Sequence, residues 1–256
     1  MLRARIPQHA RGAKGVLSGS AGDIRGILLD IEGTTTSISF VYDVLFPYAR
    51  QHVREFLDKH AGDPAVRDAI ARLREQHASD AALSPPAIGD GQDSAKTVAY
   101  VNWLMDRDSK VSALKALQGL IWEEGYQQGE VKGHVFPDVR PAFERWCSQG
   151  KMIAIFSSGS VLAQKLLFGQ TTDGDLTGYI QDYFDTTTGP KREAASYRVI
   201  ASRLKLDTAE MVFVSDVVEE LNAACVAGMR TRLCVRPGNH AQLPSRHAVI
   251  ESFDAL

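Results

Sequence analysis

The stretch Gly26-Ile27-Leu28-Leu29-Asp30-Ile31-Glu32-Gly33-Thr34-Thr35-Thr36 decides the fold of this chain. Its apolar part is too short for an independent helix, and it ends in acidic and hydroxyl side chains. This pattern predicts a buried strand that runs into a loop. Two later stretches have the same form: residues 151–156 lead into Ser157 and Ser158, and residues 210–214 lead into Ser215 and Asp216.

Helical patterns separate these strands and indicate how they assemble. The pattern at Pro141–Gln149 precedes the second strand, and that at Ala194–Leu204 precedes the third. A fourth strand is expected at Thr231–Val235, after the helical pattern at Val217–Ala227. Strands that alternate with helices form parallel sheets, because a parallel pair needs a long crossover connection. The sequence therefore predicts an α/β protein with a parallel sheet.

A long insertion separates the first two strands, and it divides the chain into units. Residues 45–133 carry four helical apolar faces, with a polar loop at Ala81–Asp93, and they predict a helical domain. The sheet is expected to contain residues 26–44 and 134–256. Residues 1–25 are basic and lack periodicity, which predicts a flexible tail; an organelle-targeting peptide is the alternative.

Composition limits the classes of protein that this chain can be. With 256 residues, 44% of them hydrophobic, the chain can bury a substantial core. A net charge of −2 gives no basic field for a nucleic acid, so small substrates are favoured. Three separated cysteines suggest neither disulfides nor zinc, and no apolar run is as long as a membrane span. We expect a cytoplasmic location with no membrane partner.

The predicted strand ends bring six polar residues to one crevice. Side chains at the carboxyl ends of parallel strands converge there, which selects Asp30, Glu32, Ser157, Ser158, Lys191 and Asp216. Crowded carboxylates repel unless a cation lies between them, and oxygen ligands suit Mg²⁺. We therefore expect Asp30, Glu32 and Asp216 to hold Mg²⁺.

The other predicted site residues suit a phosphate ester substrate. Lys191 and the serine hydroxyls can bind phosphate oxygens by charge and by hydrogen bonds. Asp30 can attack phosphorus to form an aspartyl phosphate, and Glu32 can move protons to the leaving group and from water. Taken singly, each of these residues could instead be a helix cap, a turn residue or a surface charge. Glu219 and Glu220 could pair with Lys191, contact a metal-bound water or lie in solvent.

The same residues resemble the four motifs of the haloacid dehalogenase superfamily. Asp30, Ser157, Lys191 and Asp216 match the positions of its nucleophile, hydroxyl, lysine and acidic motifs. Glu32 departs from the second aspartate of most superfamily phosphatases, and Asp-Ile-Glu-Gly-Thr-Thr is similar to the start of the enolase-phosphatase E1 family. Ala113–Tyr126, Phe156–Gly169 and Gly189–Tyr197 also resemble that family, so the resemblance covers nearly everything after the tail.

This resemblance implies a Rossmann-like core with a helical cap, and a monomer. The implied reaction is Mg²⁺-dependent enolisation and dephosphorylation of 2,3-diketo-5-methylthiopentyl 1-phosphate to an acireductone in methionine salvage. Asp30, Glu32 and Asp216 would form the metal site, while Ser157, Ser158 and Lys191 would hold the substrate. The alternatives are a phosphatase for a sugar phosphate or phosphoglycolate, a dehalogenase, and a catalytically silent module on the same fold.

Overall fold

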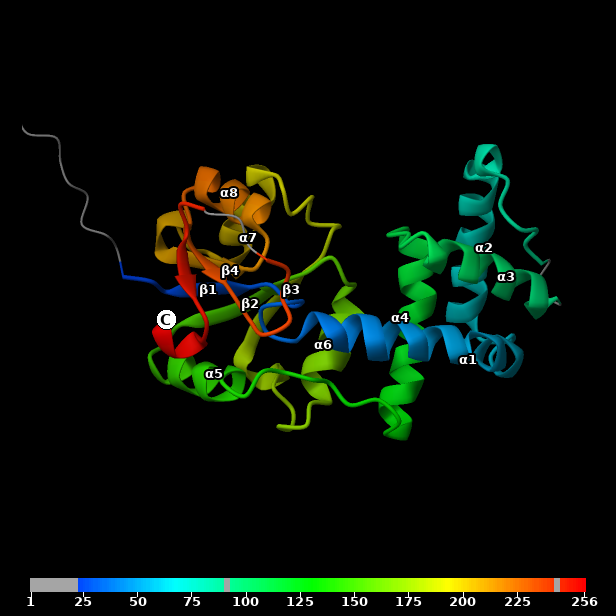
Figure 1. Cartoon of the computed structure of the whole chain (residues 1–256), viewed down its shortest axis with the longest axis horizontal. Coiled ribbons are helices and arrows are strands. Elements are labelled where there is room, and N and C mark those ends of the chain that lie inside the picture. The colour runs from blue at the N-terminus through cyan, green and yellow to red at the C-terminus, as the bar shows by residue number, and fades with distance from the viewer. Residues whose placement is uncertain (1–22, 90–92, 242–244) are drawn as a thin grey trace, which may run out of the picture.

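A parallel β-sheet with helices on both faces forms one part of the molecule in the computed structural model, which describes residues 23–89, 93–241 and 245–256 (Figure 1). In these ranges the sheet has six strands in the order β3-β2-β1-β4-β5-β6, and every neighbouring pair is parallel. The strands are β1 (Gly26–Leu29), β2 (Met152–Phe156), β3 (Ile180–Phe184), β4 (Met211–Ser215), β5 (Arg230–Cys234) and β6 (Ala248–Ile250). The α/β class predicted from the sequence is confirmed.

The central strands are apolar along their whole length because both faces of the sheet are covered. On β1, Leu28 belongs to the cluster under α7 (Ala194–Leu204) and α8 (Val218–Ala227), whereas Ile27 and Leu29 face the cluster that includes α5 (Val139–Ser148). The helix α6 (Val161–Gly169) packs beside β3. Burial on both sides fixes β1 in the centre of the sheet.

Two edge strands, β3 and β6, were not predicted from the sequence. The strand β3 carries Gln181 and Asp182 between apolar residues, and β6 has only three residues, two of them exposed. Neither has the continuous apolar run that marks a strand covered on both faces. The predicted fourth strand is present as β5, one residue earlier than expected.

The insertion between β1 and β2 is helical, as its periodicity predicted. It begins with a π-helical segment at Phe40–Leu45 and continues as α1 (Phe46–Lys59), α2 (Pro64–Ser79), α3 (Ser94–Asp106) and α4 (Ser112–Gln128). These helices pack on one another at one end of the molecule (Figure 1), and α4 also contacts α6 beside the sheet. A helical surface therefore lies beside the strand ends of the sheet.

Two further predictions concern the N-terminal tail and membrane-spanning segments. The predicted tail at residues 1–25 lies almost entirely outside the described residues. Within the described ranges, none of the helices combines the length and the apolar character that a bilayer crossing requires.

Candidate active site

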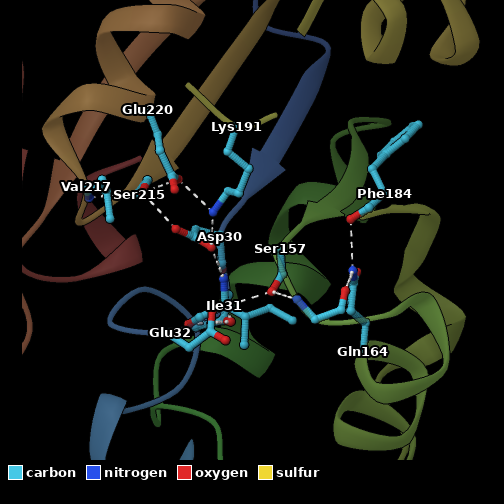
Figure 2. A network of polar contacts seen from close by, with 12 residues as sticks. Asp30, Ile31, Glu32, Ser157, Gln164, Phe184, Lys191, Ser215, Val217 and Glu220 are labelled. Carbon is cyan, nitrogen blue, oxygen red and sulfur yellow. Dashed lines mark hydrogen bonds and ion pairs between the residues drawn. The ribbon is translucent and has the colours of Figure 1, made fainter. Parts of the chain in front are cut away.

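Asp30 is held rigidly at the carboxyl end of the central strand β1 (Figure 2). Its backbone N–H donates to Val214 O at 3.0 Å, which extends the pairing of β1 with β4 by one residue. Its Oδ1 accepts from the Ile31 N–H at 2.8 Å, and its Oδ2 accepts from the Ser215 hydroxyl at 2.8 Å. The carboxylate is 2% exposed, so these contacts orient an anion that water scarcely reaches.

Lys191 is the cation that compensates this anion. Its Nζ lies 2.7 Å from Asp30 Oδ1 and 2.6 Å from Glu220 Oε2. Although burial acts to lower the pKa of Lys191, the two carboxylates outweigh it and raise the pKa above its ordinary value. The Tyr197 hydroxyl donates to Lys191 O at 2.7 Å and fixes the backbone of the lysine. The two carboxylates therefore favour the charged form of Lys191 and hold it beside Asp30.

Glu220 resolves an alternative that the sequence left open. It is buried on the first turn of α8 and pairs with Lys191, whereas Glu219 is exposed. Burial, followed by the negative charge of Asp30, raises the pKa of Glu220 to about 8. The sequence did not assign Glu220 to the site, because its pairing with Lys191 depends on how α8 packs against the strand ends.

Asp216 follows β4 directly and lies against Gly33 in the loop after Asp30. A Cβ on Gly33 would lie 2.4 Å from Asp216 Oδ2, and Gly33 has a φ of +70°. This turn therefore requires glycine both for its conformation and for the close approach of the carboxylate. Burial raises the pKa of Asp216 to about 7, with Asp30 as the second cause.

Ser157, which follows β2, faces Glu32 in the loop after β1 (Figure 2). The Ser157 hydroxyl donates to Glu32 Oε2 at 3.4 Å and accepts from the Gly159 N–H at 3.1 Å. The pKa of Glu32 is raised by burial first and by Asp30 second. A carboxyl group that retains its proton more readily than usual suits an acid that protonates a leaving group.

The helical insertion also reaches the site. Lys115 on α4 donates from Nζ to the backbone carbonyl of Ser158 at 2.8 Å. Burial lowers the pKa of Lys115, and the second cause is the nearby charge of Lys110. Nothing in the sequence around Lys115 indicated this contact, because it depends on how α4 packs against α6.

A pocket of ≈ 760 Å³ joins the strand ends to the helices. All six residues predicted for the site line it: Asp30, Glu32, Ser157, Ser158, Lys191 and Asp216. The insertion contributes apolar side chains to its lining, Leu45, Phe46, Met105, Leu114 and Trp122, and also charged ones, among them Arg50, Lys110 and Lys115. The volume suits a small molecule with one charged end and one apolar end.

The acidic side chains of the pocket fit Mg²⁺, because this ion prefers oxygen ligands. No group of three His, Cys, Asp or Glu side chains in residues 23–89, 93–241 and 245–256 has the arrangement of a metal site. The Glu32 Oε2 accepts a hydrogen bond from Ser157, and the charges of Asp30 and Glu32 both help to raise the pKa of Asp216. One or two carboxylates, together with waters and substrate phosphate, are the usual protein environment of Mg²⁺.

This fold and this set of motifs define the class of the protein. Residues 24–228 match the family model described as "haloacid dehalogenase-like hydrolase". A solved structure titled as a dehalogenase, 17% identical and covering 94% of this chain and 96% of its own, has a TM-score of 0.52, which shows the shared fold alone.

Closer relatives narrow the class to one family. The chain is 52% identical over 233 residues to the enolase-phosphatase E1 of Synechococcus elongatus, with 91% of this chain and 98% of that protein covered. It is 49% identical over 235 residues to that of Sorangium cellulosum, with 91% and 97% covered. The UTR4 protein of Saccharomyces cerevisiae is 34% identical, and 91% of this chain and all of its structure align with a TM-score of 0.75. The chain belongs to the enolase-phosphatase E1 family.

Proposed function

We propose that this chain is a Mg²⁺-dependent enolase-phosphatase of methionine salvage. Its substrate is 2,3-diketo-5-methylthiopentyl 1-phosphate, which is first enolised and then hydrolysed to the acireductone 1,2-dihydroxy-3-keto-5-methylthiopentene and phosphate. The observation that carries the proposal is the Asp30 carboxylate, fixed between Lys191 and Ser215 at a pocket that combines polar strand-end residues with apolar side chains of the insertion. Family membership supports the same reaction.

The phosphatase half assigns Asp30 as the nucleophile and Glu32 as the acid and base. A carboxylate oxygen of Asp30 bonds to phosphorus while the bond from phosphorus to the enol oxygen breaks. Glu32 gives its proton to that leaving oxygen, then takes a proton from the water that attacks the aspartyl phosphate. Phosphate leaves and the Asp30 carboxylate is restored. Lys191 and Ser157 hold the phosphate oxygens by charge and by hydrogen bonding.

The enolase half requires a base and a way to stabilise negative charge on a carbonyl oxygen. The carbon that carries the phosphate ester loses a proton, and Glu32 is the first candidate for the base. The fixed ammonium of Lys191 stabilises the charge that develops on oxygen. Mg²⁺, when bound by Asp30 and Asp216, adds positive charge at the carbonyl and phosphate oxygens.

The helical unit at residues 45–133 serves, in this proposal, as a cap on the core made of residues 26–44 and 134–256. It excludes water from the reaction and supplies apolar side chains against which the methylthio end packs. We propose that the monomer is the active unit. Light scattering of the purified protein tests this point.

A time course by proton NMR in deuterated water tests the two-step reaction. The carbon-bound proton beside the carbonyl should be lost, and an enol phosphate should form, before phosphate is released. A simple alkyl phosphate has no such proton and lacks the chelating carbonyls, so it should be a poor substrate. Equal efficiency on both esters, or phosphate release from the diketone without exchange, would favour a general phosphatase.

A further inference from the structure

The loop after β5, which carries Arg236 and Asn239, contacts the loop after Asp30. Asn239 lies three residues beyond Arg236, and its backbone N–H donates to Arg236 O at 3.1 Å. The Arg236 guanidinium is buried, is paired with Asp138 at 2.9 Å, and donates from Nε to Thr34 O at 3.1 Å. Asn239 is therefore carried on a loop anchored to the same turn that contains Gly33.

Hydrogen bonding fixes which way the Asn239 amide points. Its Nδ2 donates to Gly33 O at 2.9 Å and to Cys234 O at 3.4 Å. Both partners are carbonyl oxygens, which only accept, so the nitrogen must face them and Oδ1 must face away. The two hydrogen bonds therefore assign the nitrogen and the oxygen of the Asn239 amide.

The Oδ1 atom of Asn239 is a buried acceptor without a hydrogen-bond partner among the described residues. A Cβ on Gly33 would lie 3.0 Å from this Oδ1 and 2.4 Å from Asp216 Oδ2. The two oxygens therefore flank the same side of Gly33. Buried acceptors are costly unless a donor satisfies them, and neither of these two oxygens can donate to the other when Asp216 is ionised.

We propose that Asn239 is a positioning residue of the Mg²⁺ site, a proposal that rests on the function stated above. Its NH₂ group holds the Gly33 turn, and its Oδ1 accepts a hydrogen bond from a water on the ion that Asp216 binds. Such outer partners orient metal ligands, and their removal commonly weakens metal affinity by about 10–100-fold.

The two roles predict different outcomes for two substitutions. Asn239→Ala removes both groups, so affinity for the ion should fall about tenfold. Asn239→Asp loses the N–H donors to Gly33 but keeps an acceptor oxygen in nearly the same shape. Its affinity should therefore stay within threefold of wild type, although the apo protein melts at a lower temperature. A purely structural role would instead weaken both variants alike.

Electron paramagnetic resonance of Mn²⁺ bound to the full chain, without substrate, measures this affinity directly. Asn222→Ala is the matched control, because Asn222 is a partly buried asparagine on α8 that contacts His247 rather than the site; its affinity should equal that of wild type. If Asn239→Ala does not unfold cooperatively on heating in the presence of a chelator, it is not folded, and Asn239→Ser replaces it. The same loss of affinity is expected for Asn239→Ser.

The result separates this inference from the proposed function. Wild type that fails to bind Mn²⁺ would contradict the metal site and the proposed function together. Two results would overturn the role of Asn239 alone while wild type binds Mn²⁺ normally. In one, the affinity of Asn239→Ala stays within twofold of wild type; in the other, Asn239→Asp binds Mn²⁺ as weakly as Asn239→Ala.

Discussion

Replacement of Lys191 by methionine is the most direct test of the charge arrangement at the site. Methionine has a similar stem but no charge, so the substitution leaves Asp30 and Glu220 without the ammonium that lies 2.7 Å and 2.6 Å from them. Breaking a buried ion pair by removing one partner costs about 3–5 kcal/mol. Burial and the charge of Asp30 raise the pKa of Glu220, and Lys191 is what lowers it, so without the lysine Glu220 can take up a proton; this places the expected loss near the lower figure.

Activity should fall further than stability alone explains. The ammonium stabilises charge on phosphoryl and carbonyl oxygens, and loss of one such group commonly costs about 10²–10³ in rate. Urea unfolding at pH 7 gives the change in the free energy of unfolding, and phosphate release from folded protein gives kcat/KM. Lys132→Met, at an exposed position, is the control and should match wild type in both. Stability within 1 kcal/mol of wild type, together with kcat/KM within threefold, would refute this account of Lys191.

Three further outcomes are expected at the same site. Asp30→Asn should fold but lose phosphate release by several orders of magnitude in a malachite green assay, and near-normal turnover would remove Asp30 as nucleophile. Ca²⁺ in place of Mg²⁺ should inhibit, because its longer bonds and 6–8 ligands misplace phosphorus relative to Asp30; full activity in Ca²⁺ alone would contradict this geometry. The raised pKa of Asp216, about 7, means that the folded apo protein holds a proton which the unfolded chain releases near pH 4, so this stabilising contribution is lost as pH rises from 4 through 7. Mg²⁺ competes with that proton, so its effect on the melting temperature should be larger at pH 8 than at pH 6, and an equal shift at both would count against Asp216 as a ligand.

The sequence was sufficient to predict the centre of the sheet. Strands β1, β2 and β4 are covered on both faces, so each is a continuous apolar run with polar residues at its carboxyl end. The edge strands β3 and β6 were missed, since strands with an exposed side carry polar residues or are very short. The rule that parallel strand ends converge placed all six predicted residues around one pocket.

What the sequence could not supply was contact between distant elements. The pairing of Glu220 with Lys191 depends on the rotation of α8, and the bond from Lys115 to Ser158 depends on the packing of α4 on α6. The predicted use of Glu32 as a metal ligand assumed that residues close in sequence point to one centre. In the structure its carboxylate turns to Ser157 instead, so its place among the ligands stays a prediction.

The distance along the chain between Gly33 and its partners has a consequence for how the protein is made. Asp30 leaves the ribosome early, yet the contacts from Arg236 to Thr34 O and from Asn239 to Gly33 O span 202 and 206 residues. The nucleophile loop therefore stays incomplete until nearly the whole chain has been synthesised. Nascent chains that stall before Arg236 should therefore bear the nucleophile without the two contacts that hold its loop.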